Sequence, residues 1–458
     1  MKLGDSLNLY IGLTKIMRAC IGVNQVWPTY YLWTTLGINA FSDAYTAQGL
    51  SMSVAKTSSG KTRIAIGLPT QNSDRGRIRV FEFSIDLLSF VEMTFAGAIN
   101  VGQDLGTNQP LSYGKTLSLS KNGLYLVVGG PTALNMGDTN GVRQGFVRVL
   151  TCDVAASQWS LHGIHYDQNG ISSLTGYIYG LTYSYVTRLF GWSVAIEDSG
   201  SVIYVGSPQT ETVNQQYAGV VFKFSKSATT QQWVSSALYR HFNRANSTPY
   251  FWGFFGKDIR LSGSKLLVST GENQSTFVNN GTLLFSTANV TELKVYSDAS
   301  ANGTDNVGLN NSLALSNDGA VAAIGFPKSS SSRGKVSVFS TESPYAKIGS
   351  DITGQIINSR IGSSVSLNND GTILAIGSNG YDFNGVNNGS VVLYKRNLVT
   401  GVWKWSKYSD QLTGADGDQA GYCVDLNLAG DTVFFTSPYA NSGALADRGK
   451  LTIAKLEL

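Results

Sequence analysis

Charged residues, cysteines and histidines are all scarce in this sequence. Charged side chains make up 14% of the 458 residues, and the formal net charge is only +4. So small a charge gives no reason to expect nucleic-acid or membrane-surface binding. No run of about 18 apolar residues occurs, so no segment is predicted to insert into a membrane. The chain begins Met1-Lys2-Leu3 and lacks the apolar core of a signal peptide, which predicts a protein made in the cytoplasm.

The three cysteines, Cys20, Cys152 and Cys423, are odd in number and far apart, which favours free thiols in a reducing compartment. His162 and His165 have the spacing of a metal-binding pair, but no cysteine or carboxylate cluster completes a site, so both are interpreted as polar loop residues. No nucleophile has an evident base beside it. The sequence therefore predicts no metal, no cofactor and no enzymatic activity.

Tight turns stand where two ligand-binding loops would otherwise be expected. Ala55–Thr62 has the spacing of a phosphate-binding loop, but it leads into the strand-like Arg63–Gly67 and not into a helix. A calcium-binding blade needs several oxygen ligands at alternate positions, whereas a turn such as Asn368–Gly371 offers a single carboxylate. Both stretches are interpreted as hairpin turns, and no structural calcium is expected.

A repeated unit dominates the rest of the chain, and residues 362–394 show it most clearly. An alternating stretch, Ile361–Leu367, is followed by the hairpin signal Asn368–Gly371. The apolar run Thr372–Gly377 suits a strand buried on both faces. A polar loop then leads to a third strand, Gly389–Tyr394.

The unit occurs seven times, and each copy carries a glycine in its first turn: Gly60, Gly123, Gly200, Gly263, Gly319, Gly371 and Gly430. The mean spacing of these glycines is about 62 residues, enough for four strands and long loops. Seven such sheets set radially make a β-propeller. A stacked solenoid is the alternative, but it would need capping repeats, and none is evident.

Tryptophans mark the fourth strand in several copies, at Trp159, Trp233 and Trp403. The seventh copy has no room for a fourth strand before the last residue. The stretch Tyr30–Thr34 is therefore predicted to complete the seventh sheet and close the ring, which removes an open edge. The fold class is thus an all-β, seven-bladed propeller at residues 29–458, preceded by a short β module at residues 1–28.

The N-terminal module has a repeat of its own. Leu9–Ile16 is echoed ten residues later by Ala19–Val26, and each unit has the pattern of a strand, a glycine turn and a strand. So short a piece buries too little surface to be stable alone. It is expected to dock on its own propeller or on a neighbouring subunit. The candidate anchor residues are Ile11, Gly12, Ile16, Ile21, Gly22, Val26 and Trp27.

Two long aromatic connections, Tyr166–Phe190 and Tyr239–Phe255, each join a fourth strand to the next first strand. In an up-and-down sheet they share one face with the loops between strands two and three. Exposed tyrosine and tryptophan are enriched at interfaces. The candidate outward-facing binding residues are Tyr177, Tyr179, Tyr183, Tyr185, Tyr250, Phe251 and Trp252. The alternative is that these rings fold back and pack between the sheets.

The motifs of both parts resemble known families. The sequence Tyr-Ile-Gly at residues 10–12, Cys-Ile-Gly at 20–22 and Val-Trp-Pro at 26–28 resembles the N-terminal modules of virion structural proteins of tailed bacteriophages. The remainder resembles the integrin-type propeller family with FG-GAP repeats. Phe190-Gly191 and Phe255-Gly256 match its first element, and Gly67–Pro69, Gly206–Pro208 and Gly325–Pro327 match its second.

The resemblance implies a non-enzymatic virion protein displayed on the particle, in the tail or fibre apparatus or as a capsid decoration. Residues 1–28 would bind other virion proteins, and the propeller loops would face outward for interaction or host attachment, with a host-surface glycan or protein as the expected ligand. Neither nucleic acid nor a membrane is an expected partner. The alternatives are a cellular carbohydrate- or protein-binding propeller, or a hydrolase, which a clustered acid pair in the central channel would favour.

Overall fold

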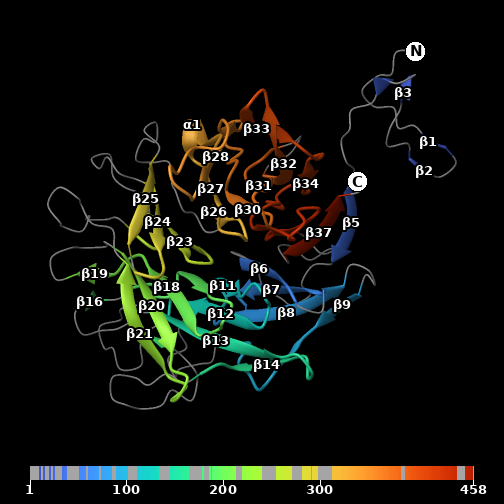
Figure 1. The fold of residues 1–458 in the computed structure, drawn as a ribbon. Coiled ribbons are helices and arrows are strands. Elements are labelled where there is room, and N and C mark those ends of the chain that lie inside the picture. The colour runs from blue at the N-terminus through green and yellow to red at the C-terminus, as the bar shows by residue number, and fades with distance from the viewer. Residues whose placement is uncertain are drawn as a thin grey trace.

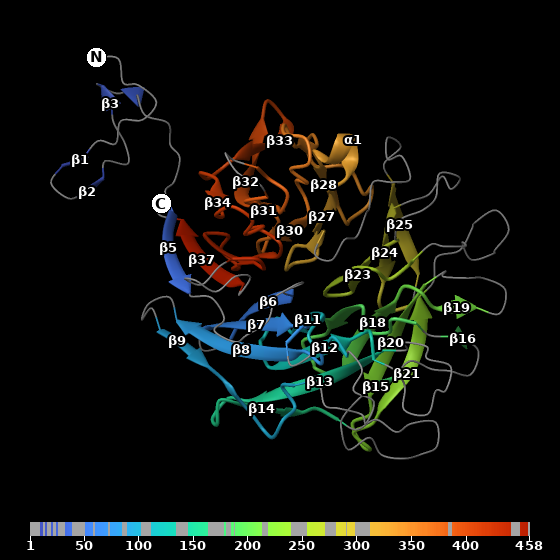
Figure 2. The same cartoon turned by 180° about the vertical axis from the view of Figure 1, so that it is seen from behind.

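The computed structural model describes residues 51–57, 60–71, 74–84, 89–101, 111–133, 145–163, 188–212, 219–239, 254–270, 281–289, 291–297, 312–382, 387–440 and 449–456, together with short strands between residues 10 and 38, at 178–179 and at 185–186. These residues form seven four-stranded antiparallel sheets, the blades of a β-propeller (Figures 1 and 2). The predicted fold class is confirmed.

Blades 1 to 4 follow one another in chain order. Blade 1 contains β6 (Ser51–Lys56), β7 (Thr62–Leu68), β8 (Arg77–Ser84) and β9 (Ser89–Glu92). Blade 2 contains β11 (Thr116–Leu119), β12 (Tyr125–Gly130), β13 (Phe146–Asp153) and β14 (Gln158–Leu161). Blade 3 contains β17 (Ser193–Ile196), β18 (Val202–Ser207), β20 (Val220–Lys226) and β21 (Trp233–Tyr239). Blade 4 contains β22 (Ile259–Ser262), β23 (Lys265–Ser269), β24 (Gly281–Ser286) and β25 (Glu292–Ser297).

Blades 5 to 7 complete the ring. Blade 5 contains β26 (Leu313–Leu315), β27 (Val321–Phe326), β28 (Lys335–Ser340) and β29 (Ile352–Thr353). Blade 6 contains β30 (Ser364–Leu367), β31 (Ile373–Ser378), β32 (Ser390–Val399) and β33 (Val402–Lys407). Blade 7 contains β35 (Val424–Leu426), β36 (Thr432–Ser437), β37 (Lys450–Leu456) and β5 (Trp33–Ile38). Trp159, Trp233 and Trp403 lie in fourth strands, as predicted.

The N-terminal strand closes the ring, as predicted. β5 pairs with β37 in antiparallel register, from Ile38 opposite Leu451 to Trp33 opposite Leu456. β5 contains Trp33 and Thr34 of the predicted stretch Tyr30–Thr34 and extends beyond it to Ile38, while Tyr30–Leu32 lie outside the described residues. The pairing partner explains the difference, because all six positions of β5 lie opposite Leu451–Leu456 of β37.

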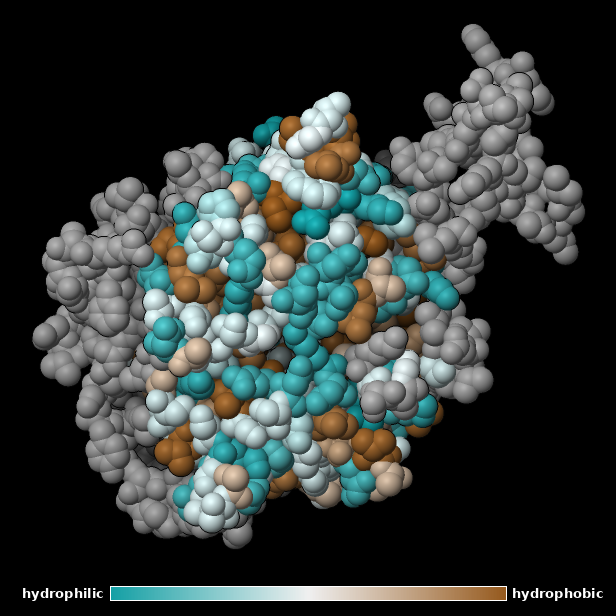
Figure 3. All heavy atoms as spheres, viewed as in Figure 1, coloured by the Kyte–Doolittle hydropathy of each residue, from teal (hydrophilic) through white to brown (hydrophobic). Residues whose placement is uncertain are grey.

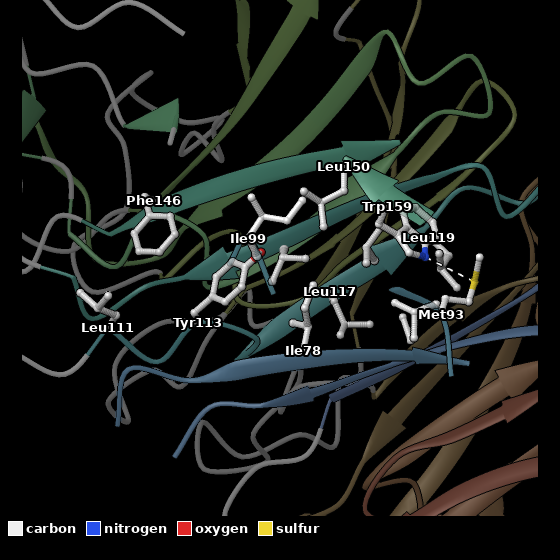
Figure 4. Packing of buried hydrophobic residues seen from close by; sticks show 14 of the residues in the cluster. Ile78, Met93, Ile99, Leu111, Tyr113, Leu117, Leu119, Phe146, Leu150 and Trp159 are labelled. Atoms are coloured by element: carbon white, nitrogen blue, oxygen red, sulfur yellow. Dashed lines mark hydrogen bonds between the residues drawn. The ribbon is translucent and has the colours of Figure 1, made fainter. Parts of the chain in front are cut away.

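The apolar core lies between neighbouring blades. Each of the seven hydrophobic clusters joins two adjacent blades, so together they fill every junction of the ring. Figure 4 shows the cluster between blades 1 and 2, where Tyr113 stacks on Phe146 and the Trp159 indole N–H donates to the sulfur of Met93 at 3.4 Å. The second strands are the most buried, and β27 and β31 are buried along their whole length. This burial agrees with the apolar runs in the sequences of the second strands.

Glycine pairs bring the backbones of adjacent blades together. A Cβ added to Gly67, Gly129, Gly206, Gly325 or Gly377 would lie 1.9 to 2.2 Å from the carbonyl oxygen of a glycine in the next blade. We call the latter residues the junction glycines: Gly114, Gly191, Gly256, Gly362 and Gly421. At three junctions a serine hydroxyl of the preceding blade also donates to that carbonyl, from Ser51, Ser193 and Ser364 at 2.6 to 2.8 Å. The repeated glycines are therefore explained by contacts that admit no side chain.

The blades present two different faces. The first strand of each blade starts after a long connection and ends in a tight turn, so the two ends of the ring differ. We call them the long-connection face and the turn face. Three short strands extend the sheets: β10 (Thr94–Phe95) pairs with β14, β15 (Ile178–Tyr179) with β13, and β34 (Leu412–Thr413) with β32. β16 (Tyr185–Val186) forms a separate pair with β19 (Glu211–Thr212).

The N-terminal repeat forms two hairpins. β1 (Tyr10–Ile11) pairs with β2 (Thr14–Lys15), and β3 (Cys20–Ile21) pairs with β4 (Asn24–Gln25). The two pairs of strands agree with the predicted pattern, while the glycine turns lie outside the described residues and the domain boundary at residue 28 stays a prediction. α1 (Ser329–Ser332) is one short turn, and the described residues include no helix long and apolar enough to cross a bilayer.

Candidate functional site

The first strands of all seven blades surround a central channel. They enclose a cavity of about 230 Å³. Hydrophilic side chains gather near the centre of the ring in Figure 3. The lysine, arginine and aspartate residues that line the cavity are Lys115, Lys121, Lys257, Asp258, Arg260 and Asp425. Residues from all seven blades line this cavity. Within the described residues, polar groups from every side of the ring therefore converge in the channel.

Lys121 spans the channel at the turn face. It follows the first strand of blade 2, and its Nζ donates to Ser262 Oγ at 3.0 Å in blade 4 and to the Asn317 carbonyl oxygen at 2.5 Å in blade 5. Burial lowers the pKa of Lys121, and Asp198 and Asp318 partly offset that effect. Lys121 therefore links blade 2 to blades 4 and 5 at this end of the channel.

The two channel carboxylates hold adjacent blades together. Asp258 Oδ1 lies 3.1 Å from Nη1 of Arg260, and its Oδ2 accepts the Leu313 N–H of blade 5 at 3.2 Å. Asp425 accepts the Val54 N–H of blade 1 at 3.0 Å and the Ser366 hydroxyl of blade 6 at 2.9 Å. Asp425 is only half-buried by area, since it borders the channel, yet protein surrounds it closely and burial raises its pKa. These contacts give both carboxylates a structural role.

At the long-connection end of the channel, Lys115 of blade 2 lies beside Trp192 of blade 3. The Lys115 Nζ is 5.9 Å from the centre of the Trp192 ring, a cation–π distance. Burial lowers the pKa of Lys115. The Trp192 indole N–H is buried and has no hydrogen-bond acceptor among the described residues. Both side chains border the channel cavity.

The predicted anchor and loop residues fall largely outside the described residues. Of the anchor set, Ile11 lies in β1 and Ile21 in β3, and Gly12, Ile16, Gly22, Val26 and Trp27 are outside. Of the loop set, Tyr179 lies in β15 and Tyr185 in β16, and Tyr177, Tyr183, Tyr250, Phe251 and Trp252 are outside. Tyr179 pairs with Phe146 at the edge of blade 2, and its neighbour Ile178 is buried between blades 2 and 3. Part of the first aromatic connection therefore folds back on the blades.

The turn carboxylates bond within their own turns. Asp318 accepts the Ala320 N–H at 2.9 Å, and Asp370 accepts the Thr372 N–H at 3.2 Å and its hydroxyl at 2.7 Å. Burial alone would raise the pKa of Asp370, but these hydrogen bonds outweigh it and the pKa is lowered. The structure places no group of three or more histidine, cysteine or acidic side chains together in the part of the chain that it describes. Cys152 and Cys423 form no disulfide bond within the described residues.

His162 lies in a loop, as predicted, but it packs between blades 2 and 3. Its ring centre is 4.8 Å from that of Tyr125, and its Nε2 is 3.1 Å from the Gly200 carbonyl oxygen. Burial, aided by the Lys226 ammonium, lowers the pKa of His162 to about 4. His162 is therefore a neutral imidazole that packs in the junction of blades 2 and 3.

Acid is expected to weaken this junction. The unfolded chain binds a proton at His162 near pH 6.5, whereas the folded chain does so only near pH 4. Stability is therefore full above pH 6.5 and falls by about 1 to 2 kcal/mol as the pH drops to 4, allowing for partial exposure of the ring. Urea unfolding of the wild type and of His162→Gln across this range measures the difference. Parallel pH profiles of the two proteins would contradict the assignment.

The channel residues were not predicted from the sequence, although their position in the repeat marks them. Lys115, Trp192, Lys257 and Tyr422 each directly follow a junction glycine. Aligning the copies on those glycines would have placed all four at the same level of the channel. Alternation identifies the first strands themselves, and these four residues precede the strands, so the alternation does not mark them.

Comparison with known proteins supports the fold alone. No family model matches the chain, and no curated protein matches it in sequence. A chain of Kuenenia stuttgartiensis hydrazine synthase is similar in structure, with a TM-score of 0.51 and 11% identity over 90% of this chain and 97% of that one. The two chains share a propeller fold. A provisionally named 6-phosphogluconolactonase from Bacteroides uniformis gives a TM-score of 0.41 and 14% identity over 77% of this chain and 97% of that chain. At these identities no activity is transferred.

Proposed function

We propose that this protein is a non-enzymatic structural component of a tailed-phage virion, displayed on the particle and attached through residues 1–28. The N-terminal hairpins carry the proposal. Each forms a two-stranded sheet of its own, and none of their four strands pairs with a strand of a blade. A two-stranded hairpin is marginal in water by itself. A second surface must therefore stabilise them, and other virion proteins are the proposed partners.

The point of attachment supports an outward-facing propeller. β5 begins at Trp33, which pairs with Leu456 at the end of β37. As the fourth strand of blade 7, β5 starts on the turn face. The module consequently joins the ring opposite the long connections. This geometry anchors one face and leaves the other free to contact a host-surface glycan or protein, whether the protein sits in the tail or fibre apparatus or on the capsid.

Replacement of Ile21 by Asp is expected to remove the protein from assembled particles. Ile21 lies in the second hairpin opposite Asn24. Burying a large apolar side chain contributes about 1.5 to 3 kcal/mol, and an unpaired charge in the same contact is costly. Quantitative mass spectrometry of purified virions, with circular dichroism of the isolated protein, measures incorporation and folding separately.

The matched control is Asn24→Asp, which adds the same charge at the facing polar position of the same hairpin. It should be incorporated at the wild-type copy number, as should Tyr183→Ala and Trp252→Ala on the long connections. A virion that carries the Ile21→Asp protein at full copy number would show that the segment is not the anchor. Absence of the wild-type chain from virions would overturn the proposed function and favour a cellular binding propeller.

A further inference from the structure

The rim of the channel on the long-connection face has a regular construction. In three successive blades the residue after the junction glycine is Lys115, Trp192 and Lys257. The Gly114 and Gly191 N–H groups donate to the Gly129 and Gly206 carbonyl oxygens at 3.0 and 3.1 Å, which sets the first two at equivalent depth. All three side chains line the cavity. An indole is thus flanked by two lysines along one arc of the rim.

The charged side chains of Arg260, Asp258, Asp425 and Lys121 have hydrogen-bond or ion-pair partners within the protein. Arg260 pairs with Asp258 at 3.1 Å and donates to the Leu313 carbonyl oxygen at 2.8 Å. Asp425 accepts three hydrogen bonds, from Val54, Ser366 and Leu426. Lys121 is held at the opposite end of the channel. Both carboxylates therefore have partners other than Lys115.

Lys115 lacks an anionic partner in the described part of the chain. Its Nζ lies 5.9 Å from the centre of the Trp192 ring. The nearby Cys423 thiol supplies no negative charge, because burial raises its pKa to about 12. The buried Trp192 N–H also lacks an acceptor. A buried donor without an acceptor is unfavourable, so a ligand oxygen that reached both groups would satisfy them.

We propose that this rim binds a small oxyanion, with its oxygens accepting from the Lys115 ammonium and the Trp192 indole N–H and with Lys257 adding positive charge. The cavity of about 230 Å³ suits a small molecule and excludes a macromolecular chain. A free phosphate ion and the carboxylate of an acidic sugar offer the same chemistry. The proposal does not depend on the N-terminal module or on a virion role.

Calorimetric titration of the full chain at pH 7.5 and constant ionic strength tests it, with sodium phosphate, sodium glucuronate and glucose as probes. Saturable binding is expected for phosphate, glucuronate or both, and the stronger of the two identifies the source. Neutral glucose should not bind. If neither anion binds, or if glucose binds as tightly as glucuronate, the proposal is wrong.

Two variants at Lys115 separate charge from packing. Lys115→Met keeps the length of the side chain and removes its donor, so affinity should fall about tenfold or more. Lys115→Arg keeps the charge and should retain most of the binding. Trp192→Phe, which removes only the N–H, should weaken binding about fivefold. Lys404→Met, on the exposed strand β33, makes the same change in net charge and should bind like the wild type. Equal affinity of Lys115→Met and Lys404→Met would overturn the assignment.

Discussion

Deletion of residues 1–40 is expected to turn a soluble propeller into an aggregating protein. The deletion removes β5, which pairs with β37 at six positions. Each lost backbone hydrogen bond costs about 1 kcal/mol, so the loss approaches the whole stability of a typical domain. The polar edge of β37 would also be left open to pair with other chains. Size-exclusion chromatography with light scattering measures the oligomeric state, and urea unfolding measures the stability.

A shorter deletion is the control. Removal of residues 1–27 takes away both hairpins and leaves β5 in place. That protein should remain monomeric, with an unfolding midpoint close to that of the wild type. A monomeric and equally stable product of the longer deletion would show that β5 does not close the ring.

Repetition made most of this fold predictable from sequence. Seven copies of one pattern carry more information than any single strand, and the missing fourth strand of the last copy pointed to the N-terminus. The extent of β5 was less predictable, because the apolar and aromatic residues at 30–33 favour a strand while Thr34–Ile38 show no regular alternation. Pairing with Leu451–Leu456 determines that the strand continues to Ile38.

The site was predictable only in part, since it depends on how separate copies meet. Lys115 and Trp192 are 77 positions apart in the chain and meet only because blades 2 and 3 are neighbours. Asp425 looks like an ordinary polar residue of a first strand, yet it bonds to blades 1 and 6. His162 was placed in a loop correctly, but its packing depends on the next blade. Contacts of this kind follow from ring closure and not from local sequence.

Replacement of Gly377 by Ala is expected to disrupt the junction of blades 6 and 7. Gly377 lies in β31, and a Cβ there would sit 2.2 Å from both the Gly421 carbonyl oxygen and Ser364 Oγ. Those two atoms are hydrogen-bonded to each other at 2.7 Å, so neither can move away without breaking that bond. Overpacking costs about 1 to 3 kcal/mol and a lost hydrogen bond about 1 kcal/mol more. Urea unfolding should therefore show a loss of about 3 kcal/mol.

Gly401→Ala, in the β32–β33 hairpin of the same blade, separates steric overlap from backbone strain. Gly401 has φ of +80° and no atom within 4 Å of an added Cβ, so its replacement should cost only about 1 kcal/mol. Hydrogen exchange should then show faster exchange at the Gly362 and Tyr422 N–H groups in Gly377→Ala alone. The Gly362 N–H donates to the Gly377 carbonyl oxygen within blade 6, and the Tyr422 N–H donates to the Thr436 carbonyl oxygen within blade 7, so both bonds flank the overcrowded contact. If Gly377→Ala is no less stable than Gly401→Ala, the blades can separate without cost and the glycine pairs do not set their spacing. A larger loss confined to Gly377→Ala means that close backbone contact, repeated at five junctions, holds the ring at its observed diameter.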